Sequence, residues 1–169
     1  PYHNAVFIGC DEQGVPRYAA LRGTVGQYKG EASGSDKQYS FHIPADSSTA
    51  TVQVFESAID LLSYASMEYR AGRDWKRDHM LSLAGVFQTN RKDVVPVALQ
   101  RYLTAYPKIQ TIVLHLDNDA VGRGAANGII SGLQDRYTMI DTPPLVGKDV
   151  NDELMHQLNK AKRKDECER

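Results

Sequence analysis

Two carboxylates stand two residues apart directly after an apolar, β-branched run. The run is Thr111 to Leu116, and the acids are Asp117 and Asp119. Such a run predicts a buried strand of a parallel sheet, and the carboxyl end of such a strand is where open α/β sheets bind ligands. Two acids that lose water at this place repel each other unless a cation lies beside them. The pattern therefore predicts a hard divalent cation such as Mg²⁺ at this strand end.

A third acid, Glu56, ends an earlier predicted strand at residues 51–55. The carboxyl ends of parallel strands lie along one edge of the sheet, so we expect Glu56 and Asp117 to face the same edge. Taken alone, Glu56 also fits an acid in the first turn of a helix, where the helix dipole favours it. An Asp-x-Asp at a strand end also fits a surface turn. The joint pattern favours a shared site over either separate explanation.

The elements that must position these acids alternate between strand and helix from residue 51 onward. The predicted strands are 51–55, 81–86, 111–116 and 137–140, and the predicted helices are 56–70, 93–106 with Asp93 as N-cap, 121–134 and a short one from 149. This order predicts an α/β fold with a parallel four-stranded sheet flanked by helices. The charged tail from residue 160 is expected to fray.

The first 50 residues have a different character. Apolar segments at 5–9 and 16–21 flank a turn-rich segment and predict a hairpin, followed by a Gly- and Ser-rich loop at 23–36 and a further strand at 38–43. We therefore expect a small β-rich N-terminal module at residues 1–50, the α/β domain at 51–158 and a charged tail at 159–169.

Composition narrows the class of protein. A hydrophobic content of 41% and a charged content of 24% fit a soluble globular chain, and no apolar run approaches the roughly 18 residues of a membrane span. The two cysteines form no Cys-x-x-Cys pair, so we expect neither a zinc site nor a disulfide framework. This cysteine usage predicts a reducing, cytoplasmic setting. The chain starts at Pro1, which suggests a fragment of a longer protein. A net charge of −1 gives no global sign of nucleic-acid binding, so such a partner would have to meet a local basic patch or a bound metal.

Three segments together resemble the Toprim domain, which is shared by bacterial-type DNA primases, topoisomerases of types IA and II, and small nucleases. Residues 52–63 resemble its strand, glutamate and following helix, and residues 112–126 resemble its Asp-x-Asp strand and glycine turn. Residues 147–154 resemble the closing Lys-Asp-x-Asn-Glu/Asp-x-Leu motif of primase-type members. The N-terminal segment, through residues 14–18 and 21–24, resembles the module that precedes Toprim in primase-like proteins of plasmids and conjugative elements.

The resemblance implies a role for each matching residue. Glu56 matches the family's acid/base glutamate, which would move a proton at a reacting oxygen and help to hold metal. Asp117 and Asp119 match the ligands of Mg²⁺, or of Mn²⁺ in its place. Asp149 would give outer-shell support to the metal site. Lys148 would touch a phosphate.

Some candidates keep two interpretations. Arg123 follows the acidic strand end and either grips a phosphate bidentately or is a solvated arginine at a helix start. Lys148 either touches a phosphate or only pairs with Asp149 or Asp152. Asp60, one turn after Glu56, either joins the acidic cluster or is an ordinary helix-start charge.

Two other residues near this edge are expected to be structural. His115 alternates with leucines in its strand, which indicates a packed, hydrogen-bonded histidine. Asp141 precedes Thr142-Pro143-Pro144 and is expected to form a turn.

The resulting expectation is Mg²⁺-dependent nucleotidyl or phosphoryl transfer on nucleic acid by a primase-like Toprim protein of a mobile element. Its partners would be DNA or RNA, nucleotides, and other replication or mobilisation proteins, and no membrane. Two alternatives stay open: a Toprim nuclease, and a non-catalytic nucleic-acid-binding or assembly module.

Two unrelated families fit less well. Residues 122–128 follow a strand as a dinucleotide-binding fingerprint would, but the third glycine position holds Asn127. Residues 117–121 resemble the Asp-x-Asp-x-Thr/Val motif of haloacid-dehalogenase phosphatases, with Asp117 as nucleophile. That family usually carries the motif near its start, and Glu56 would then have no role.

Overall fold

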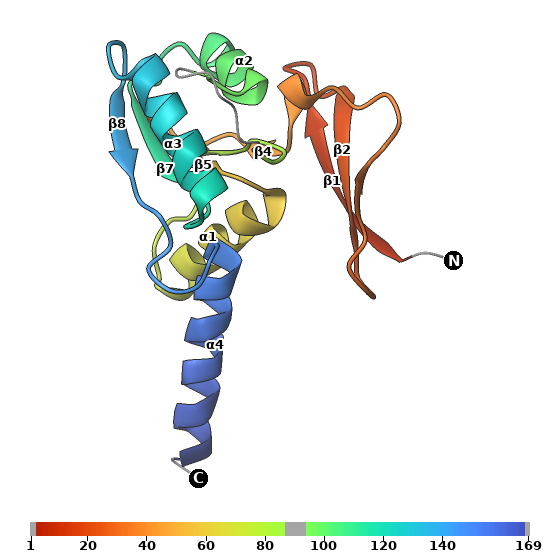
Figure 1. Ribbon diagram of the computed structural model, residues 1–169, viewed down its shortest axis with the longest axis vertical. Helices are drawn as coiled ribbons and strands as arrows, with labels where there is room; N and C mark the ends of the chain where they lie inside the picture. The colour runs from red at the N-terminus through yellow and green to blue at the C-terminus, as the bar shows by residue number, and fades with distance from the viewer. Residues whose placement is uncertain (1–2, 87–93, 168–169) are drawn as a thin grey trace.

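The computed structural model describes residues 3–86 and 94–167, which form two β-sheets and the helices around them (Figure 1). The first sheet is antiparallel and contains β1 (Asn4–Cys10), β2 (Pro16–Gly23) and β3 (Lys29–Glu31). The predicted hairpin is confirmed, because β1 and β2 pair antiparallel across a short turn. In that turn, Asp11 Oδ1 accepts hydrogen bonds from the backbone N–H groups of Gln13 and Val15. The expectation of a plain loop over residues 23–36 is wrong at β3, whose three residues pair with β2.

The second sheet has five strands in the order β4 (His42–Ile43), β6 (His79–Ser82), β5 (Thr51–Phe55), β7 (Thr111–His115) and β8 (Thr138–Asp141). The last four strands in this order are parallel, as predicted. Strand β4 adds an antiparallel edge. It is the only part of the predicted 38–43 strand that pairs, because residues 37–39 form the 3₁₀ helix η1 (Lys37–Tyr39). The segment N-terminal to residue 51 thus contributes a strand to the α/β sheet.

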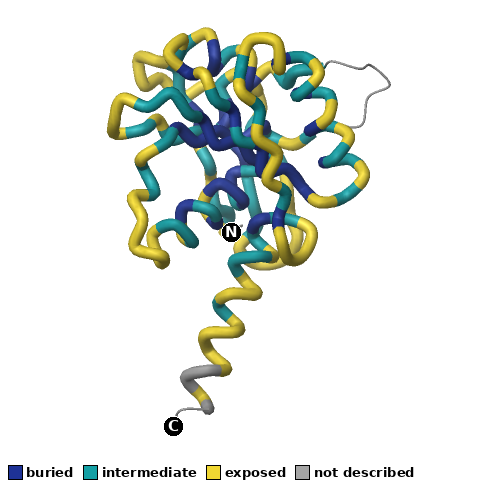
Figure 2. Tube along the Cα trace, turned by 90° about the vertical axis from the view of Figure 1, so that its left-hand side faces the viewer, coloured by how far each residue is buried: buried dark blue, intermediate teal, exposed yellow. Residues whose placement is uncertain are grey.

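Four α-helices connect or follow these strands: α1 (Ala58–Arg70), α2 (Val97–Ala105), α3 (Ala120–Leu133) and α4 (Val150–Cys167). The predicted N-cap Asp93 lies outside the described residues, and Pro96 precedes α2. The charged tail expected to fray from residue 160 is helical as far as Cys167, because α4 continues to that residue. Residues 160–166 include three lysines as well as Ala161, Arg163 and Glu166, all of which favour helices, and no glycine or proline follows Gly147. The second half of α4 projects from the body of the molecule (Figures 1 and 2).

The core has two parts, one on each face of the five-stranded sheet. Helices α2 and α3 cover one face, where Val52 and Val54 pack, and α1 and α4 cover the other, where Phe55 packs with Met80. Alternate residues of β5 therefore face opposite layers, as the period of a strand requires. The buried residues form a band along the sheet (Figure 2). Both faces are covered, so the carboxyl edge of the sheet is where loops can carry a site.

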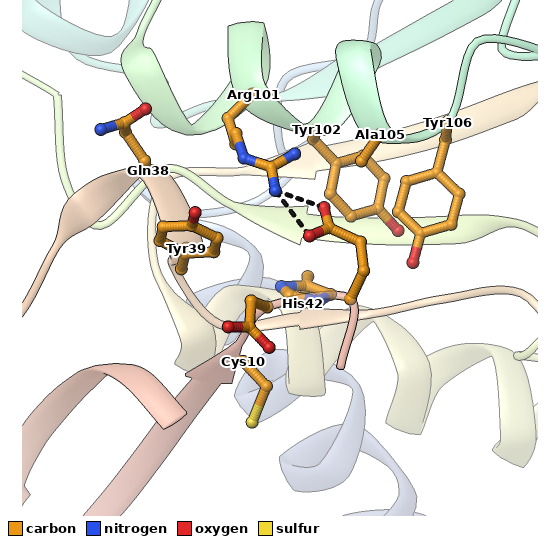
Figure 3. Close-up of a pocket in the computed structure, with 10 residues that line it drawn as sticks. Cys10, Gln38, Tyr39, His42, Arg101, Tyr102, Ala105 and Tyr106 are labelled. Atoms are coloured by element: carbon orange, nitrogen blue, oxygen red, sulfur yellow. Dashed lines mark hydrogen bonds and ion pairs between the residues drawn. The ribbon is translucent and has the colours of Figure 1, made fainter. Parts of the chain in front are cut away.

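The antiparallel sheet meets the α/β domain at a seam beside α2. Arg101 of α2 forms an ion pair with Glu12 at 2.5 Å and lies 5.0 Å from the ring centroid of Tyr39 (Figure 3). Nearby, the rings of Phe7 and Phe41 meet edge to face at 5.7 Å. None of the described helices combines the length and the apolar composition needed to cross a bilayer.

Candidate active site

Glu56, Asp117 and Asp119 lie at the carboxyl edge of the parallel sheet. Strands β5 and β7 are hydrogen-bonded neighbours, and Phe55 lies opposite His115. Glu56 directly follows β5 and Asp117 lies two residues beyond β7, so both acids leave the sheet on the same side. Asp119 then begins α3. The three acids therefore lie at one edge of the sheet, and their convergence around a shared ion stays a prediction.

The turn that carries the acid pair is held by the start of α3. Asp119 Oδ1 accepts hydrogen bonds from the backbone N–H groups of Val121 at 3.0 Å and Gly122 at 2.9 Å, which makes Asp119 the N-cap. A Cβ on Gly122 would lie 2.2 Å from the carbonyl oxygen of Asp117. Only glycine allows this approach, so Gly122 fixes how close the helix comes to the acidic turn.

Arg123 holds the same turn from the side. Its Nε donates to the carbonyl oxygen of Asp117 at 3.1 Å and its Nη2 to that of Leu116 at 2.8 Å. Its Nη1 donates to both carboxylate oxygens of Asp141, at 2.9 and 2.7 Å. The guanidinium is therefore neither free nor simply solvated: it positions the end of β7 against the end of β8. A phosphate contact by Arg123 stays a prediction.

Lys148 reaches the acid pair from the loop between β8 and α4. Its Nζ lies 3.0 Å from Asp117 Oδ2 and 3.1 Å from Asp119 Oδ2. The backbone is anchored at the same place, because its carbonyl oxygen accepts from the N–H of Asn118 at 2.7 Å and its N–H donates to Asp152 Oδ2 at 2.8 Å. Sequence predicted a phosphate contact or a pair with a neighbouring acid. The structure shows the ammonium bridging the two aspartates instead.

Asp60 and Asp149 lie behind this edge and hold helix starts. Asp60 is buried, with Oδ2 accepting from the Ser57 hydroxyl at 2.6 Å and Oδ1 from the Asn151 N–H at 3.4 Å. Asp149 Oδ1 accepts from the Asp152 N–H at 2.7 Å in the first turn of α4. The two acids therefore fasten α1 and α4 beside the site. The Ser-x-x-Asp spacing of 57 and 60 is a capping signal that sequence analysis left unused.

Comparison with known proteins identifies the domain that carries these acids. Residues 53–154 match the family described as Toprim-like. The chain belongs to the Toprim-like family. Residues 1–47 match a family described as a protein of unknown function (DUF3991). No match was found among curated protein sequences.

Solved primase structures share the fold. The primase fragment of the bacteriophage T7 primase-helicase protein gives a TM-score of 0.57 at 14% identity, over 96% of this chain and 61% of that one. A T7 complex, in which a lagging-strand DNA polymerase interacts with primase domains of two gp4 subunits bound to an RNA/DNA hybrid and dTTP, gives 0.53 at 16% identity, over 96% and 74%. A DNA primase domain from Pseudomonas aeruginosa gives 0.56 at 14% identity, over 94% and 49%. The predicted Toprim domain and its primase-type fold are confirmed, and the chain spans about half to three quarters of these structures.

The carboxyl groups of the Toprim-like site influence one another. Burial, followed by the nearby charge of Asp117, raises the pKa of Glu56 to about 7, and Asp119 and Asp60 add to the rise while Lys148 opposes it. Burial is also the main cause that raises the pKa of Asp60 to about 6. The coupling shows that the Glu56 carboxyl lies within electrostatic reach of both aspartates.

The two aspartates themselves shift in opposite directions. Burial raises the pKa of Asp117, and the hydrogen bond from Lys148 limits the rise. The N–H of Gly122 and then Lys148 lower the pKa of Asp119. Together the carboxylates raise the pKa of Lys148 above its ordinary range. The edge thus holds more negative than positive charge.

The three acids offer donor atoms of the kind that a hard divalent cation prefers, although they are not gathered into a metal site. Within residues 3–86 and 94–167, no three Asp, Glu, His or Cys side chains converge on one point as the ligands of an ion. The ammonium of Lys148 instead stands between Asp117 and Asp119, as a cation of the protein's own. Carboxylate oxygens are the ligands preferred by Mg²⁺ and Mn²⁺. Glu56, Asp117 and Asp119 are the residues that could hold such an ion.

His115 is packed and hydrogen-bonded, as sequence predicted. Its Nε2 lies 2.8 Å from Gln53 Oε1, and Gln53 Nε2 donates to Asp78 Oδ2 at 2.9 Å. Its ring stacks on Phe55 at 4.9 Å, and burial lowers the pKa of His115 to about 4. It is therefore neutral at physiological pH and supports the ends of β5 and β7.

Proposed function

We propose that this chain catalyses metal-dependent nucleotidyl transfer on nucleic acid, as a primase-like module. One observation carries the proposal: Glu56, Asp117 and Asp119 of a Toprim-like domain share one edge of the sheet and are electrostatically coupled. A cluster with this excess of negative charge needs a cation to approach a phosphate, which is the situation of metal-assisted phosphoryl chemistry.

Each acid has a distinct role in this proposal. Asp117 and Asp119 hold Mg²⁺, or Mn²⁺ in its place, which when bound neutralises phosphate charge and orients reacting oxygens. Glu56 accepts the proton of an attacking hydroxyl or returns it to a leaving oxygen. A carboxyl group whose pKa is near 7 suits both directions of proton transfer at neutral pH. Arg123 keeps the end of β7 in position, and Asp149 and Asp60 keep the neighbouring helices in position.

The proposed substrates are nucleoside triphosphates and a DNA or RNA strand. The support is the fold shared with primases over 94% or more of this chain, and the T7 complex whose primase domains are bound to an RNA/DNA hybrid and dTTP. The resemblance of the N-terminal motifs at 14–18 and 21–24 supports assignment to a primase-like protein of a mobile element, and we place its action in the cytoplasm. Replication or mobilisation proteins are the partners that such a protein would meet.

The test is primer synthesis by the 169-residue chain. The protein is incubated with single-stranded DNA, labelled nucleoside triphosphates and Mg²⁺, and the products are sized on a gel. We expect oligonucleotide products that require template, triphosphates and Mg²⁺ together. Glu56→Gln should lower the rate by about 10²-fold or more, the usual worth of an acid/base group, while Mg²⁺ binding persists. Glu68→Gln is the matched control, because Glu68 lies on α1, pairs with Arg73 just beyond that helix and is outside the candidate site.

The same assay separates the alternatives. Cleavage of nucleic acid with metal alone, without triphosphates, would identify a nuclease. Binding of nucleic acid with no turnover, equally strong in Glu56→Gln, would identify a non-catalytic binding or assembly module. Undiminished turnover in Glu56→Gln would remove Glu56 from the mechanism.

A further inference from the structure

We propose that Lys148 is an internal counter-ion, which a divalent cation displaces from the aspartate pair so that its ammonium becomes free to bind a substrate phosphate. The inference rests on the proposed metal site and adds to it a resident competitor. The Lys148 side chain then has two positions. Without metal its ammonium contacts the aspartates, and with metal its ammonium contacts the phosphate.

The competition is for identical atoms. Asp119 Oδ1 accepts hydrogen bonds from the N–H groups at the start of α3, so Oδ2 is the oxygen that Asp119 offers to a cation. Lys148 Nζ contacts this Oδ2 at 3.1 Å and Asp117 Oδ2 at 3.0 Å. Of the described side chains, no other lysine or arginine forms an ion pair with either carboxylate. A cation that uses Asp119 Oδ2 must therefore take the place of the ammonium.

The side chain of Lys148 can move while its backbone stays in place. The backbone of Lys148 is hydrogen-bonded on both sides, to Asn118 and to Asp152. Gly147, at φ +80°, packs so closely on Asp152 that a Cβ would lie 2.3 Å from the Asp152 Cβ, so the loop stays in place. The Lys148 side chain is 57% exposed on a flexible four-carbon stem. Its ammonium can leave the aspartates with no change in the fold.

Arg123 shows what a fixed cation at the same edge looks like. Its side chain is 25% exposed, and its guanidinium donates to two backbone carbonyls and to Asp141. Displacing it would leave those groups without partners, whereas displacing Lys148 exposes only an ammonium to water. The two cations at this edge therefore have different duties: Arg123 positions the strand end, and Lys148 is exchangeable.

Charge balance favours the exchange. Asp117 and Asp119 present two carboxylates to one ammonium, with the Glu56 carboxyl group beside them, and a dication neutralises this group of acids better than a monocation does. Once displaced, the ammonium lies beside the metal-bound edge, where a phosphate would add new negative charge. Metal and triphosphate should then strengthen each other's binding, since coupling between two ligands is reciprocal.

The first test follows the lysine itself in the wild-type chain. Reductive methylation of lysines is timed by mass spectrometry with and without Mg²⁺. We expect Mg²⁺ to speed modification of Lys148 several-fold, because the freed amine loses its two carboxylate partners. Lys76 is the internal control, since it pairs with Asp46 at 3.3 Å and should not respond. An unchanged Lys148 rate under Mg²⁺ concentrations that saturate the site would overturn the displacement.

The second test compares Mg²⁺ affinities by calorimetry without nucleotide. Lys148→Met should bind Mg²⁺ about three- to tenfold more tightly than wild type, on the order of the worth of two partly exposed ion pairs. Lys76→Met should match wild type. With Mg²⁺ present, Lys148→Met should bind a nucleoside triphosphate more weakly than wild type does.

The outcomes separate the two proposals. If wild type and Lys148→Met both fail to bind Mg²⁺, the metal site is wrong and the displacement falls with it. If wild type binds Mg²⁺ and Lys148→Met binds it equally or more weakly, only the displacement is wrong. If displacement is observed but no primer is made, the proposed reaction fails and the counter-ion role stands.

Discussion

Two regions of this molecule pair acidic side chains with a cation, but in different proportions. At the seam between the sheets, Glu12 meets a single guanidinium, that of Arg101, at 2.5 Å. At the carboxyl edge of the five-stranded sheet, Asp117 and Asp119 share a single ammonium, that of Lys148, and Glu56 lies within its electrostatic reach. The pKa of Glu12 is lowered, by its own backbone N–H and then by Arg101, whereas the pKa of Glu56 is raised to about 7.

The difference shows in which region the negative charge is fully neutralised by the protein's own cation. One acid against one guanidinium leaves no charge to neutralise, so the seam is a structural joint. Two aspartates against one ammonium, with Glu56 beside them, leave an excess of negative charge that the described side chains do not neutralise. An excess of charge maintained at a strand end is the mark of a functional site, because it weakens the fold unless a ligand compensates it.

The largest expected effect concerns metal binding. Asp117→Asn combined with Asp119→Asn should abolish Mg²⁺ binding in calorimetry, because the amides carry no charge and coordinate a hard cation poorly. The fold should survive, since asparagine also serves as an N-cap for α3. Glu12→Gln at the seam should leave Mg²⁺ affinity unchanged. Equal affinity in the double variant and wild type would refute the metal assignment.

The next effect concerns how closely α3 approaches the acidic turn. Gly122→Ala places a Cβ against the Asp117 backbone and should lower the free energy of unfolding by about 1–3 kcal/mol, the usual result of overpacking. Gly124→Ala, on the same helix, points into open space and should raise that free energy by up to about 1 kcal/mol. Urea unfolding measures both. Similar effects of the two changes would show that the close approach is not a constraint.

The pH dependence of stability should have opposite signs in the two regions. Folding raises the pKa of Glu56 from 4.5 to about 7, so the folded state holds a proton that the unfolded state has lost. Its contribution to stability is therefore full below about 4.5 and disappears as pH rises through 7. The lowered pKa of Glu12 gives a contribution that is present above its ordinary pKa and lost in acid.

Thermal unfolding of the metal-free protein across pH 5–8 tests this contrast. Glu56→Gln should flatten the fall in thermal midpoint between pH 5 and pH 7, and Glu12→Gln should not. A slope that Glu56→Gln leaves intact would mean that the titrating group lies elsewhere.

The smallest effect is expected at the seam. Arg101→Ala removes the contacts with Glu12 and Tyr39 and should lower the thermal midpoint slightly, since exposed ion pairs contribute little. Mg²⁺ affinity should stay at the wild-type value. A loss of Mg²⁺ binding in this variant would show that the seam and the carboxyl edge are coupled, and the comparison between them would fail.

Sequence reasoning located the acids because their positions depend on local patterns. A β-branched run followed by Asp117 predicts a parallel strand end, and Asp119 carries the chemistry of an N-cap. The short strands β3 and β4 were missed in whole or in part because two or three residues carry no periodic signal and form only by pairing with a distant strand. The length of α4 was underestimated because charge was taken as a sign of fraying when the same residues are good helix formers.

The partners of Arg123 and Lys148 could not be predicted, and the reason is distance along the chain. Arg123 meets Asp141 eighteen residues later, and Lys148 meets Asp117 across the whole of α3 and β8. No spacing rule connects such pairs, since they depend on how two loops fold over the same edge. Alternation in the strand was enough to predict that His115 is packed, but not that Gln53 is its partner.

The backbone bond between Asn118 and Lys148 has a practical consequence for anyone who modifies this protein. It ties the connection before α4 to the acidic turn. An affinity tag, a fluorophore or an extra residue inserted at 147–149 would therefore move the Lys148 ammonium away from the aspartates and disturb both loops. The tip around Val25, which is 86% exposed, is hydrogen-bonded through Thr24 to His3 rather than to the acidic turn, and is the better place for a reporter.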